Sequence, residues 1–378
     1  MNEHDQRALD ILRELGSRPA VPFFEGPPAA YILEALHALG VRAGRDDFGN
    51  IIAHYKRTPG SDQPPIAFVA HMDHPGFEIT EAGENGIIAR ALGGVPVASL
   101  RKPTPVLVLT SDGRRLPAEL LPYKGSSPQD DSERLASVQM KSKVALVPPV
   151  PVVFDLPDFI LDDDTIRMRA LDDLAGCSSI LAALERLVAS DAVAEMYAVF
   201  TRAEEGGLFG ARLMAEAGAL PQETLVVSVE SSPVIPGVAQ GEGPVIRTGD
   251  AAYTFDADAE QVLIAAREAI KERDPAFKSQ RQLMSGGTCE ATAFAVFGYR
   301  ATGIAFPLGN YHNATTRISD PDGGVGAEYI KLSDFLAGVE LITEAATSAA
   351  GRDASPARRR LGQVPDDVRK RLEDSAKS

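Results

Sequence analysis

The chain changes its secondary-structure pattern along its length, and this change constrains its fold more than any other feature. After about residue 165, apolar β-branched runs alternate with amphipathic stretches, which predicts strands and helices in turn. Between about 75 and 165, short apolar runs are separated by Gly, Pro, Asn and Asp turn signals, and no long helical period is present. The pattern predicts a three-layer α/β/α domain with a mixed, largely parallel sheet and an inserted small β-barrel or sandwich.

The length of 378 residues exceeds that of a typical single domain, so two domains are expected. We assign residues 1–74 and 166–350 to one discontinuous α/β domain and residues 75–165 to the inserted β-rich domain. Residues 351–378 form a polar tail that carries Arg358-Arg359-Arg360, and we expect this tail to be mobile or a short surface helix.

The predicted elements follow the positions of apolar residues and turn signals. Gly26-Pro27-Pro28 is expected to break the chain before the second helix, and Asp172-Asp173 is expected to open a later helix. The other predicted helices cover residues 5–16, 208–217 and 261–272, and the predicted strands cover 50–55, 65–70, 196–201, 225–229 and 302–306.

Charge and cysteine content narrow the classes of function. With 38 basic and 53 acidic residues, the net charge of −15 argues against nucleic acid or an anionic membrane as the main partner. The N-terminus has no secretory signal pattern and no run approaches a membrane span, so a cytoplasmic location is expected. Cys177 and Cys289 form no CxxC pair, so we expect buried small side chains, not a thiolate zinc site.

Carboxylates and imidazoles recur at or near the ends of the predicted strands, where ligands gather in α/β sheets. They lie in His71-Met72-Asp73, Asp172-Asp173, Glu204-Glu205, Glu230 and His312. A dinuclear hydrolytic site holds two metals roughly 3.5–4 Å apart and needs a bridging carboxylate, further ligands on each metal and a general base. This donor set therefore predicts a two-metal hydrolytic site.

Each segment also has an ordinary structural interpretation. Asp172-Asp173 suits the N-cap of a helix, Glu204-Glu205 suits a solvated acidic turn, and His71 suits a surface loop. Two adjacent glutamates at a strand end nevertheless repel each other unless a cation is bound. With a metal present, one glutamate can bind it while the other takes a proton from water. Asp73 is placed to accept the second N–H of a metal-bound His71, whereas His74 is expected to be a bystander or a substrate contact.

Taken together, these motifs resemble the glutamyl aminopeptidase and cellulase-like family of dinuclear metallopeptidases, which includes the tetrahedral aminopeptidases. The resemblance runs from about residue 45 to 345. The matching stretches are Ala70-His71-Met72-Asp73, Gly76-Phe77, Glu84-Asn85-Gly86, Ala170-Leu171-Asp172-Asp173, Ala175-Gly176-Cys177, Glu204-Glu205-Gly206, Gly210-Ala211, Gly286-Gly287-Thr288 and the loop with His312.

The resemblance implies a role for each residue. His71 and Glu230 would bind one metal, Glu205 and His312 the other, Asp172 would bridge them, Glu204 would be the general base and Asp73 would orient His71. It also implies a non-proline cis peptide between Asp172 and Asp173. Relatives with a dimerisation lid insert it after the position of Glu230, whereas this chain has its insertion between His71 and Asp172. The chain therefore resembles the aminopeptidase-like group more than the carboxypeptidase and deacylase group.

Three departures from the family pattern affect the expected substrate pocket. Glu230 stands where Asp is common, Cys289-Glu290 follows Gly287-Thr288 where Asp is usual, and the segment 307–311 lacks an Arg. The sequence consequently leaves the preferred N-terminal residue and the peptide length open.

The function that this resemblance implies is a metal-dependent aminopeptidase acting on peptides. It would use two divalent ions per chain, with zinc expected and cobalt or manganese as alternatives. A dinuclear amidohydrolase of the deacylase or carboxypeptidase type, acting on N-acyl amino acids, is one alternative. A non-catalytic binding module with this fold is another. Because family members often form large hollow assemblies, a homo-oligomer is also expected.

Overall fold

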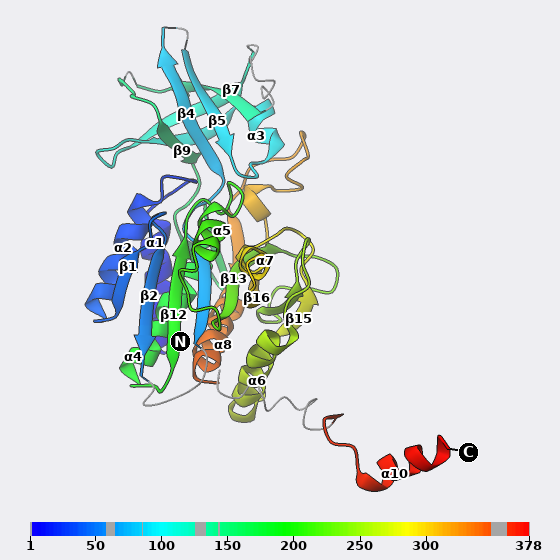
Figure 1. The fold of residues 1–378 in the computed structure, drawn as a ribbon. Helices are drawn as coiled ribbons and strands as arrows, with labels where there is room; N and C mark the ends of the chain where they lie inside the picture. The colour runs from blue at the N-terminus through cyan, green and yellow to red at the C-terminus, as the bar shows by residue number, and fades with distance from the viewer. Residues whose placement is uncertain are drawn as a thin grey trace.

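An eight-stranded mixed sheet forms the centre of the larger body in the computed structural model, which describes residues 2–57, 65–84, 86–124, 134–142, 144–348 and 361–377 (Figure 1). In spatial order its strands are β1 (Arg42–Arg45), β2 (Ile51–Lys56), β12 (Glu195–Thr201), β3 (Ile66–His71), β13 (Leu225–Pro233), β16 (Arg300–Leu308), β14 (Val245–Gly249) and β15 (Gln280–Leu283). The four central strands β12, β3, β13 and β16 run parallel, while β2 and β14 pair antiparallel with them. Their carboxyl ends therefore lie at one edge of the sheet.

Helices cover both faces of this sheet, which confirms the predicted three-layer α/β/α fold. One face buries the apolar sides of α1 (Glu3–Gly16), α2 (Gly26–Ala38), α4 (Leu174–Ala189), α6 (Ala257–Arg273) and α8 (Leu332–Ser348). The other face buries those of α5 (Phe209–Glu216) and α7 (Glu290–Val296). Cys177 and Cys289 are buried free thiols in these two cores, as predicted.

A closed six-stranded barrel stands at one end of the sheet and confirms the predicted β-barrel (Figure 1). In order around the barrel the strands are β4 (Gly76–Gly83), β5 (Gly86–Leu92), β8 (Leu135–Met140), β7 (Arg115–Pro122), β6 (Thr104–Leu109) and β9 (Val150–Phe154), with helix α3 (Val97–Arg101) between β5 and β6. Alternate residues such as Phe77, Val106 and Val152 fill its core, as the two-residue period of a strand requires.

A separate three-stranded sheet lies outside the barrel. It joins β10 (Ile160–Asp162) and β11 (Thr165–Met168) to β17 (Glu328–Lys331) from the C-terminal part of the chain. The division into domains at residues 75 and 165 stays a prediction, while the barrel strands themselves run from Gly76 to Phe154.

Two elements differ from their predicted bounds for simple physical reasons. Helix α2 begins at Gly26 and includes both prolines in its first turn, where a missing N–H is harmless and the fixed φ suits a helix. Strand β13 continues to Pro233, so Glu230 lies inside the strand instead of following it. Its pairing with β16 over nine residues keeps the chain extended past the apolar run.

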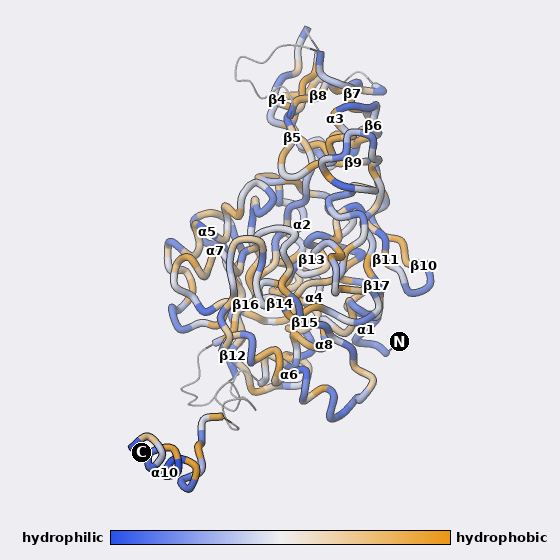
Figure 2. The backbone as a smooth tube through the Cα atoms, turned by 90° about the vertical axis from the view of Figure 1, so that its right-hand side faces the viewer, coloured by the Kyte–Doolittle hydropathy of each residue, from blue (hydrophilic) through white to orange (hydrophobic). Residues whose placement is uncertain are grey.

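The C-terminal segment leaves the body of the molecule. Within it, α10 (Asp366–Ser375) has no buried residue and lies away from the sheet and barrel in both views (Figures 1 and 2). The described part of the tail thus agrees with a surface helix, whereas Arg358-Arg359-Arg360 lie outside the described residues. Among the described residues, no helix is both long and apolar enough to cross a membrane.

Candidate metal centre

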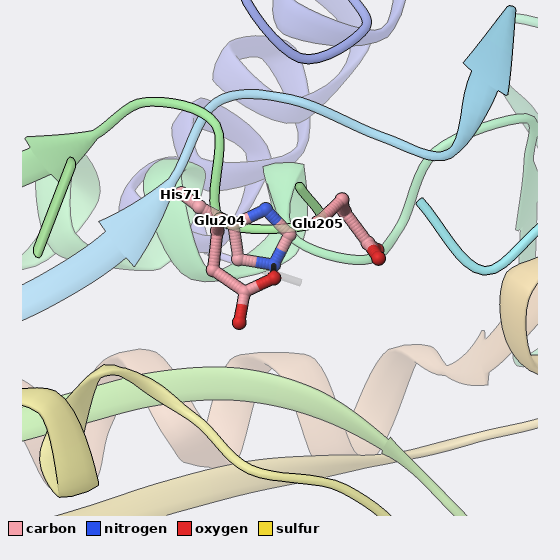
Figure 3. Close-up of side chains that lie close together, drawn as sticks. All are labelled: His71, Glu204 and Glu205. Atoms are coloured by element: carbon pink, nitrogen blue, oxygen red, sulfur yellow. Dashed lines mark ion pairs between the residues drawn. The ribbon is translucent and has the colours of Figure 1, made fainter. Parts of the chain in front are cut away.

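The predicted ligands meet at the carboxyl edge of the central sheet. His71 is the last residue of β3, Glu204 and Glu205 follow β12, and Glu230 lies near the end of β13. Asp172 stands between β11 and α4, and His312 lies in the short helix η2 (Tyr311–Asn313) after β16. Figure 3 shows the His71 imidazole beside the Glu204 carboxylate at this edge, with Glu205 next to them and its side chain extending to one side. The structure therefore brings together residues separated by as many as 241 positions in the sequence, from His71 to His312.

His71 is almost fully buried and faces two carboxylates. Its Nε2 lies 3.3 Å from Asp172 Oδ1 and 3.8 Å from Glu204 Oε2. Its Nδ1 lies 3.0 Å from the main-chain carbonyl of Asp73, so an Nδ1–H donates there and leaves Nε2 free to bind a metal. The acceptor for His71 is therefore the backbone carbonyl of Asp73. The Asp73 carboxylate is too far from Nδ1 to accept this hydrogen bond, at 3.9 Å.

The Asp73 carboxylate instead holds the turn that carries the two glutamates. Its Oδ1 accepts the Glu204 N–H at 3.0 Å and its Oδ2 accepts the Glu205 N–H at 3.1 Å. A buried carboxylate with both oxygens used in this way fixes the backbone from which Glu204 and Glu205 project. Asp73 thus positions His71 and the glutamate turn at the same time.

Asp172 lies between the two imidazoles. The Asp172–Asp173 peptide bond is cis, as predicted from the resemblance. Asp172 Oδ1 faces His71, and its Oδ2 lies 3.6 Å from His312 Nε2. Asp173 is the N-cap of α4 and accepts the Gly176 N–H at 3.1 Å. The capping interpretation therefore applies to Asp173, while Asp172 is directed into the site.

His312 is held by the barrel and by its own loop. Its Nδ1 lies 3.0 Å from the carbonyl of Gly94, which lies just after barrel strand β5, and its Nε2 lies 3.1 Å from Glu205 Oε1. The Tyr311 ring packs against the imidazole, with ring centroids 3.8 Å apart. His312 adopts a left-handed φ of 53°, which is uncommon outside glycine and is found mostly where surrounding contacts impose it.

Three groups of ligand atoms among the described residues are close enough to hold a cation. Each group has all its ligand atoms within 4.8 Å of one another: His71–Asp172–Glu230, Asp172–Glu205–His312, and His71–Glu204–Glu205. The first two share Asp172, which is the geometry that a bridging carboxylate gives.

The oxygen and nitrogen atoms of these groups are arranged as metal ligands and not as a network of hydrogen bonds. Among the described residues, Glu230 Oε1 is buried without a hydrogen-bond partner, while the buried Asp172 Oδ1 and Glu205 Oε1 have as their polar neighbours the candidate ligand nitrogens of His71 and His312, at 3.3 and 3.1 Å. Buried carboxylate oxygens without partners are costly unless a cation binds them. Imidazole nitrogens and carboxylates are also the ligands that zinc and related divalent metals take in proteins. The residues present therefore suit a divalent metal.

The electrostatics of the site point the same way. Burial raises the pKa of Glu204, and the charges of Glu205 and Glu290 raise it further. Burial, Glu290 and Glu204 likewise hold the pKa of Glu230 well above its usual range. Burial lowers the pKa of His71, but Glu204 and Asp172 outweigh it and the pKa rises. Crowded carboxylates of this kind are stabilised by a bound cation.

These shifts predict how pH affects the metal-free protein. Because the folded pKa values of Glu204 and Glu230 lie above their ordinary value near 4.5, the folded state binds protons that the unfolded state has released. Its stability should therefore rise as the pH falls through the raised pKa values toward 4.5, whereas bound cations keep these carboxylates ionised. We expect the difference in Tm between metal-loaded and chelated protein to shrink over this range. A difference that stays constant or grows would contradict the prediction.

Two buried residues that no sequence motif indicated support the ligands. Glu328 accepts the N–H groups of Leu171 and Asp172 on Oε2, at 2.8 and 3.0 Å, and that of His312 on Oε1, at 2.9 Å. Glu25 accepts the Ala203 N–H at 2.9 Å and pairs with Arg202, just before Glu204. Apart from the Glu328–His312 contact, which joins residues 16 positions apart, these contacts join residues at least 156 positions apart, so no local spacing predicts them.

His74 is expected from the sequence to be a bystander or a substrate contact. It is buried, and its two ring nitrogens face the Asp172 carbonyl at 2.7 Å and Asn313 Oδ1 at 2.9 Å. It therefore joins the Asp172 segment to the His312 loop.

A cavity of about 350 Å³ opens directly on these groups. Its wall includes six of the candidate residues: His71, Asp172, Glu204, Glu205, Glu230 and His312. The remaining lining includes the segment 286–289, Tyr311 and the buried Arg247. The centre is thus accessible to a small substrate or to one end of a larger one.

Comparison with known proteins identifies the family. The family model described as M42 glutamyl aminopeptidase matches residues 133–323, which is just over half of the 378 residues. A relative from Acetivibrio thermocellus named "Putative aminopeptidase" is 24% identical over 347 residues, covering 86% of this chain and 98% of the relative.

Solved structures share the fold. An aminopeptidase from the archaeon Desulfurococcus kamchatkensis superposes with a TM-score of 0.74 at 23% identity, covering 94% of this chain and 99% of the other. The TET1 peptidase of Pyrococcus horikoshii superposes with a TM-score of 0.72 at 22% identity, covering 90% of this chain and 99% of the other. Since the family model spans most of the site as well as half of the chain, this chain belongs to the M42 glutamyl aminopeptidase family and is a peptidase hydrolase.

Proposed function

We propose that this peptidase is a metal-dependent aminopeptidase that removes N-terminal residues from peptides. The observation that carries the proposal is the pair of ligand groups sharing Asp172, which opens on a cavity that also contains the Glu204 carboxylate. The name of the Acetivibrio thermocellus relative agrees with this activity.

The proposed ligand assignment follows the two overlapping groups. His71 and Glu230 would hold one divalent ion, Glu205 and His312 would hold the other, and Asp172 would bind both. Imidazole and carboxylate donors favour zinc, with cobalt or manganese as alternatives. When bound, such ions supply Lewis-acid activation of the scissile carbonyl and of a water molecule.

Glu204 would transfer the protons of the reaction. Its side chain is 11% exposed and lines the cavity, while its backbone is fixed by Asp73. Burial and the neighbouring carboxylates raise its pKa in the metal-free site, and bound cations would offset this rise so that the carboxylate can accept a proton. In this role Glu204 takes a proton from the attacking water and delivers it to the nitrogen of the leaving amine.

The acidic cavity also favours a free N-terminal amine. Glu205 and Glu230 would carry the metals, so a free substrate amine would contact the metal site or the nearby Glu204 carboxylate, and an N-acyl nitrogen cannot make these contacts as a charged group. A deacylase or carboxypeptidase acting on N-acyl amino acids is the second candidate, because Arg247 in the same cavity can bind a carboxylate.

The decisive experiment pairs metal analysis with a substrate panel. We expect about two divalent ions per purified chain, and hydrolysis of aminoacyl-anilides that stops on chelation and returns when zinc, cobalt or manganese is restored. Hydrolysis confined to N-acetylated substrates would favour the deacylase, and a protein that binds no metal would favour a binding module.

We also propose that the chain forms a homo-oligomer. The Pyrococcus horikoshii peptidase that shares its fold is described as assembling into a tetrahedron or a large octahedral shell. Light scattering on the purified full-length chain would test this: a mass well above the 40.2 kDa of one chain supports it, and a monomer contradicts it.

A further inference from the structure

A second cavity adjoins the metal-site cavity on the side of the barrel. It has a volume of about 590 Å³ and shares four wall residues with the metal-site cavity: Gly94, Pro233, Gly286 and Tyr311. The Tyr311 ring packs against the His312 imidazole, so the boundary between the two cavities lies beside a proposed metal ligand. A molecule bound at the metal centre can therefore extend into the second cavity.

The barrel and the loop after η2 build this cavity together. Helix α3 of the barrel lies on one side of it, and residues 316–319 of the loop lie on the other. The loop runs beside α3 (Figure 1) and is fixed to it, because the Val97 N–H donates to the Ile318 carbonyl at 2.8 Å. Lys102, at the end of α3, also donates to the carbonyl of Asp322 at 2.9 Å. These contacts give the cavity a wall with a defined position.

The wall of the second cavity is basic, although the chain as a whole is acidic. In a chain with a net charge of −15, the described wall residues include two arginines, Arg134 and Arg317, and no Asp or Glu. The apolar side chains of Val95, Leu100 and Ile318 line the same wall. A local excess of positive charge attracts an anion, and apolar neighbours strengthen the attraction by excluding water.

Both guanidinium groups have donors that can bind an anion. Arg134 uses its Nη2 to donate to the carbonyls of Ala91 and Gly93, at 3.1 and 2.9 Å, and these acceptors are neutral. Within the described ranges, the Arg317 side chain forms no hydrogen bond or ion pair. Both side chains are exposed, so they lie where the cavity opens to solvent.

The reaction of an aminopeptidase determines the direction of its substrate. Only one residue precedes the scissile bond, and every later residue lies beyond it. The metal-site cavity includes the buried side chains of Met284 and Cys289, which are 1% and 2% exposed, whereas Thr316 and Arg317 of the second cavity are exposed. The side chain of the N-terminal residue therefore fits the buried part, and the rest of the peptide extends through the second cavity toward solvent.

We propose that Arg317 and Arg134 bind the C-terminal carboxylate of short peptide substrates. The side chain after the scissile bond packs against the apolar wall described above. The inference rests on the proposed aminopeptidase function and adds to it the peptide length and the terminal group that the enzyme selects. A guanidinium binds a carboxylate through two parallel charge-assisted hydrogen bonds, whereas a C-terminal amide is neutral. Each added residue moves the carboxylate by up to about 3.3–3.6 Å, so long peptides carry it past the arginines.

The test compares peptides that differ only in their C-terminal group. For the wild-type enzyme we expect kcat/KM to be about tenfold higher for leucyl-leucine or trileucine than for the C-terminal amide of the same peptide, an effect between that of a buried charge-assisted hydrogen bond and that of an exposed ion pair. The difference should lie in KM, because the contact is remote from the reacting atoms and is the same in the bound substrate and the transition state. For a hexapeptide, the acid and the amide should react alike.

Variants of the two arginines connect this preference to the second cavity. Arg317→Gln should bring the acid-to-amide ratio of kcat/KM close to one by raising KM for the free acid. Arg317→Lys should keep part of the preference, because it retains the charge without the planar guanidinium. Arg134→Gln should also lower the ratio, and metal analysis of this variant shows whether the turn at Gly93 still supports His312.

A matched control separates this effect from a general loss of positive charge. Arg267→Gln, which removes an arginine paired with Glu268 on α6, should keep the wild-type ratio. Thermal melting of each variant shows whether the fold is intact. If Arg317→Gln fails to fold, the lysine variant and the wild-type acid-to-amide ratio still decide the matter.

Other outcomes would overturn the inference. Equal wild-type rates on short acids and their amides, or an equal loss on both in Arg317→Gln, would show that the arginines do not bind the C-terminus. Among C-terminal amides, a preference for a glutamyl over a glutaminyl residue after the scissile bond, lost in Arg317→Gln, would place the bound carboxylate on a side chain instead. Failure of every free-amine substrate with metal present would refute the proposed function itself, whereas good turnover of a leucyl-anilide without any preference for free acids refutes only this inference.

Discussion

Replacing Glu204 with Gln is expected to lower kcat by roughly 10²–10⁴-fold, the range that loss of a general acid–base group produces. Gln has nearly the same shape and keeps a hydrogen-bonding oxygen, but it cannot accept the proton of the attacking water. The Asp73 contacts to the backbone N–H groups of Glu204 and Glu205 do not involve the changed side chain, so the turn should keep its position. The metal content should likewise stay at the wild-type value.

Steady-state kinetics on the best anilide substrate and metal analysis of the same sample check this prediction. Glu223→Gln, at an exposed position before β13, is the matched control and should leave both measurements unchanged. Because His71, Glu204 and Glu205 form a third possible ligand group, a clear loss of metal in Glu204→Gln would assign Glu204 to metal binding. Residual activity above about a tenth of wild type, far outside the range for a general base, would remove Glu204 from that role.

Replacing Glu328 with Gln is expected to weaken both the fold and the metal centre. The Glu328 carboxylate accepts three backbone N–H groups, two from the segment that carries Asp172 and one from His312. A glutamine keeps one oxygen and turns an NH₂ group toward at least one of these donors. We expect a loss of about 2–4 kcal/mol in the free energy of unfolding. Because Asp172 and His312 lose their shared support, metal affinity should fall by roughly 10–100-fold.

Denaturant unfolding and competition with a metal indicator measure the two effects separately. Glu272→Gln on the exposed side of α6 is the matched control. A variant with unchanged metal affinity would contradict the positioning role, even if its stability fell. A variant with unchanged stability would show that water can replace the lost acceptor.

The sequence predicted the architecture well because the fold depends on local patterns. A single sequence shows the spacing of apolar residues that predicts each element. This spacing has a period of two in the barrel strands and a helical period in stretches such as Leu174–Ala189. The candidate ligands were also found, since strands that run parallel present their carboxyl ends at the same edge. Their roles as ligands and base remain predictions, to be decided by the experiments above.

The supporting residues were not predicted, and the reason is physical. Glu328 and Glu25 stand in segments with no motif, and each accepts backbone N–H groups from residues more than 150 positions away in the chain. Only the burial of their charged side chains distinguishes these residues from ordinary surface residues. Burial depends on the packing of the whole domain, so the sequence alone does not reveal it. The predicted end of strand β13 was wrong for a similar reason. The strand continues past Glu230 because β16 pairs with it over this stretch.

The contact between Gly94 and His312 joins the barrel to the candidate metal centre. A Cβ at Gly94 would lie only 2.6 Å from His312 Nδ1, and the Gly94 carbonyl faces that same nitrogen at 3.0 Å. The barrel therefore cannot be exchanged independently of the sheet. A chimera that carries another barrel would have to keep the Gly93-Gly94 turn, because this turn contacts His312. We therefore expect that a change in the position of the barrel relative to the sheet would also displace the imidazole of His312, a proposed metal ligand.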